Sequence, residues 1–153
     1  MTKNQKKCKI LVADDDPDDR FLLEDALTET KLADHLYFVE DGEQLMDYLH
    51  GRGKYTDRRS CPRPDLILLD LNMPKKDGWE ALKEIKSDPH LRQIPIVVFT
   101  TSKAEEDIYR TYDLGVNSFI SKPVSYEGLL NLVQKLGIYW FETVSLPNFK
   151  YHM

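Results

Sequence analysis

The sequence predicts an α/β fold, with one doubly wound, five-stranded parallel sheet and helices on both faces. Short apolar runs of strand length alternate with longer segments whose apolar residues recur at helical spacing, which is the pattern of repeated βα units. Five such units can be counted along the chain. The 153 residues can bury one full core but are too few for two ordinary domains, so we expect a single domain.

The first unit combines a buried strand with a well-marked helix start. Residues 8–13 (CKILVA) are too continuously apolar for a half-solvated strand, so they predict one that is buried on both faces. Asp16 followed by Pro17 predicts the N-cap and the first turn of a helix. Asp18 and Asp19 fall in that first turn, where the helix dipole favours negative charge. The residues expected on the apolar face of this helix are Phe21, Leu22, Ala26 and Leu27.

The second unit is followed by a long irregular segment. A strand over 35–39 leads through the turn Asp41-Gly42 into a helix. The residues of this helix that are expected to face the core are Leu45, Met46 and Leu49. Residues 51–64 (GRGKYTDRRSCPRP) are rich in Gly, Pro and Arg without periodicity, so we expect a solvated surface loop rather than a binding patch.

The last three units end their strands at polar side chains. We expect strands over 65–69, 96–99 and 118–120, and helices over about 79–86, through Ile108 and Leu114, and through Leu129, Leu130, Val133 and Leu136. The run 65–69 (DLILL) is the most hydrophobic and predicts the central strand, which ends at Asp70. The next strand ends at Thr100, and the fifth leads to Lys122-Pro123.

Composition excludes several classes of function. Lys and Arg number 21 against 26 Asp and Glu, a net charge of -5, so the chain lacks the basic surface that a nucleic-acid binder needs. No run of about 18 apolar residues and no signal-peptide pattern occurs, so we expect a cytoplasmic protein that is not in a membrane. Cys8 and Cys61 form no CxxC pair and are expected to be reduced thiols. The sequence contains no GxGxxG, P-loop or GxSxG pattern, so no independent enzymatic activity is expected.

Polar residues follow four of the five predicted strands. Because the carboxyl ends of parallel strands meet at one edge of a sheet, these residues should lie together. They are Asp14, Asp15 and Asp16 after the first strand, Asp70 after the third, Thr100 after the fourth and Lys122 after the fifth. Each alone has a plain structural explanation as a capping turn, a strand terminus, a loop hydroxyl or a solvated cation. Their coincidence at four strand ends favours a common site.

Several carboxylates at one edge of a sheet need a cation to offset their repulsion. Magnesium takes oxygen ligands, keeps several waters and commonly binds one or two carboxylates with a phosphate oxygen. Asp15, Asp70 and a backbone carbonyl near Asn72 would fit that need. No EF-hand pattern occurs, so we expect Mg²⁺ rather than calcium. A carboxylate beside such an ion can attack phosphorus, with a lysine and a hydroxyl balancing the charge of the transferred group.

These segments resemble the receiver domain of two-component response regulators. ILVADDDPDD is similar to the family's first strand and acidic cluster, PDLILLDLNMPKKDG to its phosphoacceptor segment, IPIVVFTTS to its switch strand and SFISKP to its lysine-proline motif. The spacings from Asp70 to Thr100 and to Lys122 also match the family pattern. The resemblance covers about residues 7–141, and it implies the flavodoxin-like strand order 2-1-3-4-5.

The resemblance also implies a role for each matching residue. Asp70 would be the phosphoacceptor, Asp15 a direct Mg²⁺ ligand and Asp14 an outer acidic partner that acts largely through water. Asn72 would lend its backbone carbonyl to the metal. Thr100 and Phe119 would be the switch hydroxyl and the switch aromatic, and Lys122 the charge-balancing lysine, which in the family often precedes a cis proline, here Pro123. Thr101 stands where the family usually has a smaller residue. This departure bears on the rates of reaction at the aspartyl phosphate rather than on the role of the site.

The family resemblance implies a signalling mechanism. A sensor histidine kinase or histidine phosphotransfer protein would pass a phosphoryl group to Asp70, with self-catalysed transfer and autodephosphorylation as the only chemistry. Thr100 and Phe119 would then move together and alter the surface made by the fourth helix, fifth strand and fifth helix.

The C-terminal segment is dense in aromatic residues. It contains Tyr139, Trp140, Phe141, Phe149 and Tyr151. These side chains could pack on their own domain, or form a subunit or partner interface, where aromatic residues are enriched. We divide the chain into a receiver domain, 1–141, and an aromatic extension, 142–153. The extension resembles that of stand-alone receivers paired with bacterial phytochromes, which implies a homodimer through the fourth helix and the tail.

Three alternative functions fit the sequence less well than this one. A phosphatase of the haloacid dehalogenase type needs a general acid two residues after its nucleophile, and Asn72 cannot serve as one. A flavodoxin-like FMN binder would need a phosphate-binding first loop, whereas three aspartates repel phosphate. A receiver-shaped scaffold that works without phosphorylation is disfavoured by the complete set of acidic, hydroxyl and lysine positions, but the sequence leaves it open.

Overall fold

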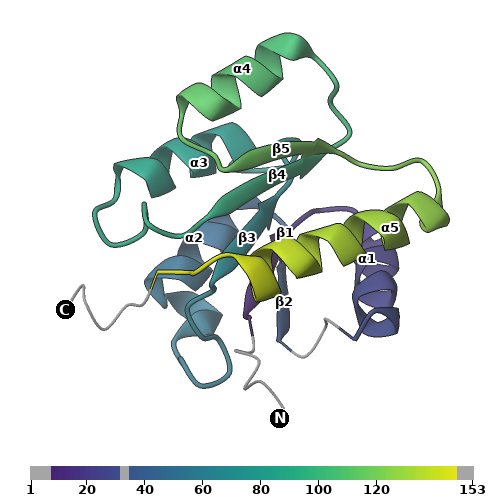
Figure 1. Cartoon of the computed structure of the whole chain (residues 1–153). Helices are drawn as coiled ribbons and strands as arrows, with labels where there is room; N and C mark the ends of the chain where they lie inside the picture. The colour runs from purple at the N-terminus through teal and green to yellow at the C-terminus, as the bar shows by residue number, and fades with distance from the viewer. Residues whose placement is uncertain (1–7, 32–34, 148–153) are drawn as a thin grey trace.

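Five parallel strands form one sheet in the order β2-β1-β3-β4-β5, as expected (Figure 1). The computed structural model describes residues 8–31 and 35–147. The strands are β1 (Ile10–Ala13), β2 (Leu36–Val39), β3 (Leu66–Leu69), β4 (Ile96–Thr100) and β5 (Ser118–Ser121). The helices are α1 (Pro17–Glu29), α2 (Gly42–His50), η1 (Gly53–Tyr55), α3 (Gly78–Ser87), α4 (Glu105–Asp113), α5 (Tyr126–Gly137) and η2 (Ile138–Thr143). The most hydrophobic strand, β3, lies at the centre of the sheet and pairs with β1 and β4.

Side chains alternate along the strands and so build a core on each face of the sheet. On one face α2 and α3 bury Leu45, Met46, Leu49, Ala81, Leu82 and Ile85 against Leu11, Ile67 and Val98. On the other face α1 and α5 bury Leu23, Ala26, Leu27, Leu129 and Val133 against Ile10, Leu68 and Val97. Helix α4 lies at the β5 edge of the sheet (Figure 1) and buries only Thr111. The predicted inward face of α2 is therefore confirmed.

The predicted apolar face of α1 was partly wrong. Phe21 and Leu22 are 70% and 41% exposed, whereas Leu23 is buried with Ala26 and Leu27. Positions 23, 26 and 27 share one narrow stripe of a helix, and this stripe is what meets the sheet and α5. Asp16 caps α1 as predicted, because its carboxylate accepts the backbone N–H groups of Asp18 and Asp19.

The segment 51–64 is anchored rather than freely solvated. Tyr55 is buried, and its ring lies 5.2 Å from that of Tyr48 on α2. The Arg58 guanidinium donates hydrogen bonds to the carbonyl oxygens of Tyr48 and Leu49 at the C-terminal end of α2. Two side chains that lack any periodic pattern thus fasten this loop, which explains why the sequence predicted only its surface location.

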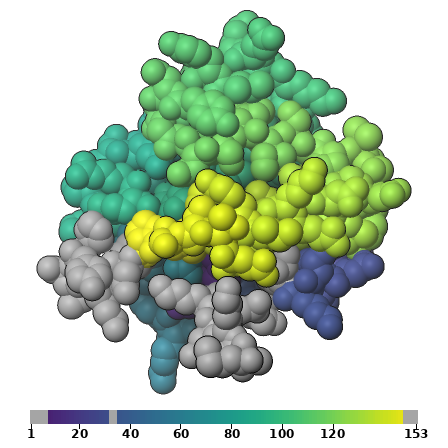
Figure 2. All heavy atoms as spheres, in the orientation of Figure 1, coloured from purple at the N-terminus to yellow at the C-terminus, as the bar shows by residue number. Residues whose placement is uncertain are grey.

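The start of the aromatic tail packs on its own domain. Trp140 is buried against the α1–α5 core, and Phe141, Val144 and Leu146 are partly buried there. Figure 2 shows the α5–η2 segment crossing this face of the molecule. Tyr139 is 52% exposed, and Phe149 and Tyr151 lie outside the described residues. No helix within 8–31 and 35–147 has the length and hydropathy needed to cross a bilayer.

Candidate functional site

The ends of β1, β3, β4 and β5 bring the predicted polar residues together. The Thr100 hydroxyl donates a hydrogen bond of 2.9 Å to Asp70 Oδ1, and Lys122 Nζ lies 3.0 Å from Asp70 Oδ2. Lys122 Nζ also lies 2.7 Å from Asp14 Oδ2. Residues from four strands thus meet around one carboxylate, as their positions at the strand ends predicted.

Asp70 is held in a fixed orientation. It is 6% exposed, and its Oδ1 atom accepts both the buried Thr100 hydroxyl and, at 3.1 Å, the backbone N–H of Asn72. Its Oδ2 atom accepts from Lys122. Hydrogen bonds to both oxygens hold this carboxylate in one orientation, which suits a nucleophile that must attack along one line.

Gly78 closes the loop that carries Asp70. Its backbone N–H donates to the Leu71 carbonyl at 3.0 Å. A Cβ atom at this position would lie only 2.4 Å from the Asp70 carbonyl oxygen, so a larger residue would displace the backbone that bears the carboxylate. The Asp77-Gly78 pair therefore has two roles: Gly78 allows the close approach to the Asp70 backbone, and Asp77 caps α3.

Three carboxylates form the acidic cluster expected to hold a cation. Asp14, Asp15 and Asp70 each offer an oxygen, and these oxygens all lie within 4.8 Å of one another. Asp14 is buried, while Asp15 is exposed and open to an incoming ion. Carboxylate oxygens at this separation fit a hard divalent cation. Asn72 is placed beside Asp70 by its backbone N–H, and the ligand role of its carbonyl stays a prediction.

Lys122 is the counter-charge of this cluster. Burial would lower its pKa, but hydrogen bonds to Asp14 and Asp19 outweigh burial, so the pKa of Lys122 is raised. Burial raises the pKa of the Asp14 carboxyl, and its hydrogen bond to Lys122 opposes that rise. The aromatic ring of Phe99 lies 5.9 Å from Lys122 Nζ and adds a cation–π contact.

Two residues of the site were missed by sequence reasoning. Asp19 on α1 pairs with Lys122 at 2.8 Å, although the sequence suggested only a favourable interaction with the helix dipole. Arg20 donates a hydrogen bond of 2.7 Å to the Asp14 carbonyl and pairs with Glu40. The usable signal was that the first turn of α1 follows the strand-end aspartates directly, so its side chains reach the same edge of the sheet.

The predicted switch residues lie on the neighbouring strands β4 and β5. Phe119 pairs in register with Val98, two residues before Thr100, so the two switch side chains belong to the same face of the sheet. Phe119 is half-buried against the α2–α3 core, and its backbone N–H donates to the Tyr112 hydroxyl of α4 at 3.2 Å. Thr101 is exposed. No peptide bond of the described residues is cis, so the bond before Pro123 is trans.

Comparison with known proteins identifies the family. Residues 10–134 match the response regulator receiver domain. The chain belongs to this family. The match favours the receiver interpretation over the phosphatase and flavin-binding alternatives.

Relatives of this receiver include proteins of phytochrome signalling. It is 43% identical to the response regulator Rcp1 of Synechocystis sp. over 145 residues, which are 94% of this chain and 95% of Rcp1. The structure of the phosphorylated cyanobacterial phytochrome response regulator RcpA matches with a TM-score of 0.85 and 43% identity, covering 92% of this chain and 99% of that one. The Mn²⁺-bound form of Rcp1 matches with a TM-score of 0.83 and 41% identity over the same shares. This receiver is therefore a protein of two-component signalling, and its acidic cluster fits a divalent metal.

Proposed function

We propose that this receiver is a single-domain response regulator that accepts a phosphoryl group on Asp70 from a histidine kinase or a histidine phosphotransfer protein. The supporting observation is the meeting of Asp70 with Lys122, Thr100 and the acidic cluster at one edge of the sheet. The phosphorus–nitrogen bond of the donor's phosphohistidine breaks as a bond forms between phosphorus and an Asp70 oxygen. The imidazole leaves and the acyl phosphate remains.

The residues around Asp70 have distinct parts in this reaction. Lys122 balances the charge of the transferred group. The Thr100 hydroxyl, which donates a hydrogen bond to Asp70 in the unphosphorylated chain, donates to a phosphoryl oxygen after the transfer. Magnesium would be held directly by Asp15 and Asp70 and by the carbonyl of Asn72, with Asp14 acting largely through water. When bound, this ion would neutralise charge on the phosphoryl oxygens. A Mn²⁺-bound form of the relative Rcp1 supports a divalent ion at this site.

Phosphorylation would act through a conformational switch. Movement of Thr100 toward the phosphoryl group frees space beside β4, and Phe119 moves with it. Because the Phe119 backbone is hydrogen-bonded to Tyr112, this change reaches α4 and the surface formed by α4, β5 and α5. The chain catalyses only its own phosphorylation and dephosphorylation, and it acts in the cytoplasm.

The partner kinase is proposed to be a bacterial phytochrome. Support comes from relatives whose names place them in phytochrome signalling, RcpA among them. Phosphotransfer from purified kinases, measured in parallel, would identify the partner by the fastest transfer.

The test replaces the acceptor carboxylate. Asp70→Asn should abolish labelling by acetyl phosphate, because a neutral amide cannot form the acyl phosphate. Asp65→Asn is a matched control, since Asp65 precedes the same strand at its opposite end and accepts a hydrogen bond from the Lys9 backbone. Labelling should persist in the Asp65→Asn control. In both this control and the original chain it should disappear when EDTA removes the divalent ion. Undiminished labelling of Asp70→Asn would refute the assignment.

A further inference from the structure

Every donor of the Lys122 ammonium group is already in use. A lysine has three N–H donors. Nζ lies 2.7 Å from Asp14 Oδ2, 2.8 Å from Asp19 Oδ2 and 3.0 Å from Asp70 Oδ2. A phosphoryl oxygen can therefore bond to Lys122 only if one of these three carboxylates gives up its place.

Asp19 is the carboxylate that is easiest to release. Its side chain is 36% exposed, against 5% for Asp14 and 7% for Asp70, so water can replace Lys122 as its partner. Among the described residues its carboxylate accepts a hydrogen bond from Lys122 alone. The other two are held further, Asp14 by the Asp16 backbone N–H and Asp70 by Thr100.

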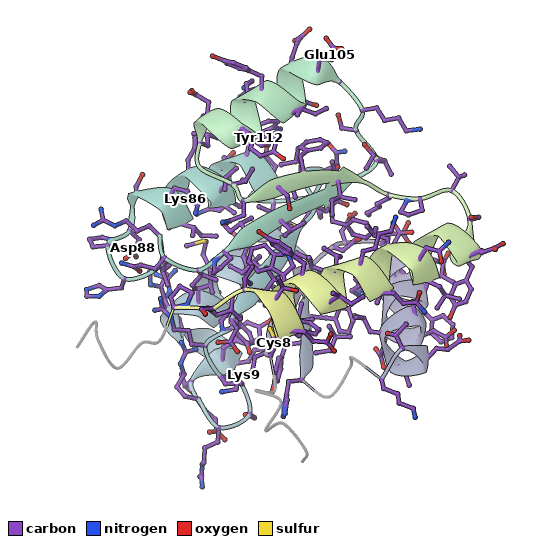
Figure 3. The ribbon with its side chains drawn as sticks, in the orientation of Figure 1. Cys8, Lys9, Lys86, Asp88, Glu105 and Tyr112 are labelled. Carbon is purple, nitrogen blue, oxygen red and sulfur yellow. The ribbon has the colours of Figure 1, made fainter. Side chains whose placement is uncertain are left out.

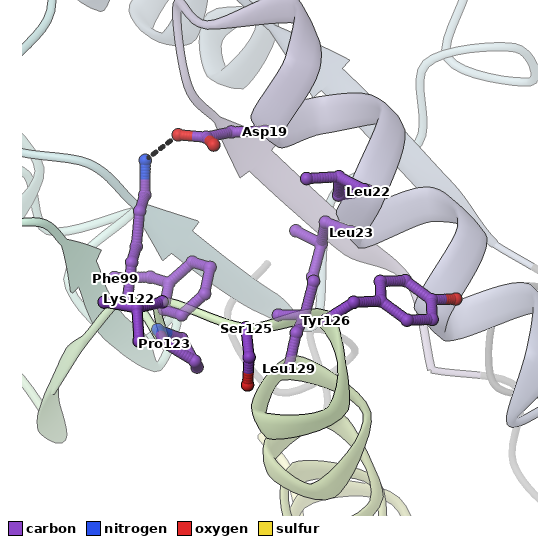
Figure 4. Close-up of a pocket in the computed structure, with 10 residues that line it drawn as sticks. Asp19, Leu22, Leu23, Phe99, Lys122, Pro123, Ser125, Tyr126 and Leu129 are labelled. Carbon is purple, nitrogen blue, oxygen red and sulfur yellow. Dashed lines mark hydrogen bonds and ion pairs between the residues drawn. The ribbon is translucent and has the colours of Figure 1, made fainter.

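The fold holds Asp19 where this exchange can happen. It projects from the first turn of α1 toward Lys122, above the apolar side chains that join α1 to α5 (Figure 4). Its backbone is fixed, because the Asp16 carboxylate accepts its N–H. When Asp19 is released, Lys122 is still held by Asp14 and by the Phe99 ring, beside the Asp70 side chain that carries the phosphoryl group.

We propose that Asp19 is a positioning residue that holds Lys122 in the unphosphorylated site and yields its hydrogen bond to the phosphoryl group of phosphorylated Asp70. This inference rests on the proposed function and extends it to a residue on α1. Asp19 then competes with the phosphoryl group for Lys122, so it disfavours the phosphorylated state. Phosphorylation also breaks the ion pair between Asp19 of α1 and Lys122. Because Lys122 directly follows β5, the first turn of α1 is then held less tightly to the end of that strand.

Asp19→Asn tests the competition. At a fixed, sub-saturating acetyl phosphate concentration, the steady-state ratio of phosphorylated to unphosphorylated chain should rise about three- to tenfold, because an amide oxygen competes less well than a carboxylate. Asp18→Asn is the matched control. It removes the same first-turn charge, and the exposed Asp18 side chain contacts no other described residue through a hydrogen bond or ion pair. Asp19→Glu keeps a carboxylate and should return the ratio to within about twofold of the original chain.

A second measurement is independent of phosphorylation. The Lys122 ammonium protons, followed by nitrogen-detected NMR, should exchange with water several-fold faster in Asp19→Asn and not in Asp18→Asn. Equal exchange rates in Asp19→Asn and the original chain would overturn the three-carboxylate arrangement. Equal labelling ratios in the two chains would overturn the exchange step alone. A complete lack of labelling in the original chain would instead contradict the proposed function, and the exchange step with it.

Discussion

At the scale of single residues, Cys8 makes stability depend on pH. It lies in the core with Trp140, and burial raises the pKa of its thiol to about 12, with the charge of Asp65 adding to the rise. The unfolded chain loses this proton near pH 9.0, whereas the folded chain keeps it until about 12. The unfolded state thus binds fewer protons above pH 9, so the free energy of unfolding is unaffected below pH 8 and falls as pH rises.

The free energy of unfolding should fall by about 1.4 kcal/mol by pH 10, since one pH unit above the pKa of the unfolded chain corresponds to about 1.36 kcal/mol for one group. Urea denaturation at pH 7.5, 9 and 10 measures it. Cys8→Ala removes the titrating group and should lose less stability over this range than the original chain, even though its stability at pH 7.5 is lower. An equally steep fall in both chains would show that Cys8 is not the cause.

Prediction from the sequence succeeded for residues whose backbone position fixes their surroundings. Asp14, Asp70, Thr100 and Lys122 end or follow strands, and the carboxyl ends of parallel strands lie at one edge of the sheet. Asp19 and Arg20 belong to a helix, so their partners depend on how α1 sits on the sheet. Spacing along the chain places this turn at the same edge of the sheet but does not specify which partners its side chains reach, which is why both were missed.

At the scale of elements, α4 is attached by polar contacts rather than by apolar burial. Thr111 is its one fully buried residue. Arg110 stacks over the Trp79 ring of α3 at 4.2 Å, and Asp107 accepts a hydrogen bond from Ser102. Figure 3 shows Tyr112 on the side of α4 that faces β5, where its hydroxyl accepts the Phe119 N–H. A helix held in this way can shift at low cost.

Tyr112→Phe should release the Phe119 backbone from α4. Loss of the hydroxyl acceptor should speed amide exchange at Phe119 several-fold and lower the free energy of unfolding by about 0.5–1 kcal/mol. Hydrogen exchange followed by NMR measures the first effect. Tyr109→Phe serves as control, because Tyr109 is 74% exposed and its hydroxyl bonds to no other described residue. Similar exchange at Phe119 in the two variants would contradict the role of Tyr112.

Element types were easier to predict than their faces. Apolar runs such as 66–69 favour a buried strand at this length, and Asp16 before Pro17 marks the start of α1. Asp41 and Asp77 also cap helices in the structure. The face of α1 was ambiguous because apolar residues cover more of that helix than the sheet can bury. The attachment of loop 51–64 depends on Tyr55 and Arg58, whose partners on α2 no local pattern specifies.

At the scale of the whole molecule, we predict a homodimer through the surface from α4 to the tail. Tyr139 is 52% exposed and lines a groove together with Ile120 and Leu132, and the residue before it in the chain, Ile138, is 57% exposed. Exposed apolar residues next to an edge strand such as β5 are typical of an interface. Because Val144 and Leu146 pack on the core, point substitutions test this surface more cleanly than deletion of 142–153.

Ile138→Ser combined with Tyr139→Ser should shift sedimentation from dimer to monomer at micromolar concentration. Phe21→Ser is the control, since Phe21 is 70% exposed on α1, away from this surface, and its loss should leave the dimer intact. A monomer for the original chain, or a dimer that survives the double substitution, would remove the predicted interface.

Gly78 gives a criterion for deciding which other members of the family can be phosphorylated. The Asp70 carbonyl oxygen occupies the space where any side chain at position 78 would begin. A homologue with alanine or serine there must bend its acceptor loop, and the reactive carboxylate would no longer point toward lysine and threonine. Such chains could keep every polar residue of the site and still fail to accept a phosphoryl group. Glycine at position 78 is therefore as informative about phosphorylation as the aspartate itself.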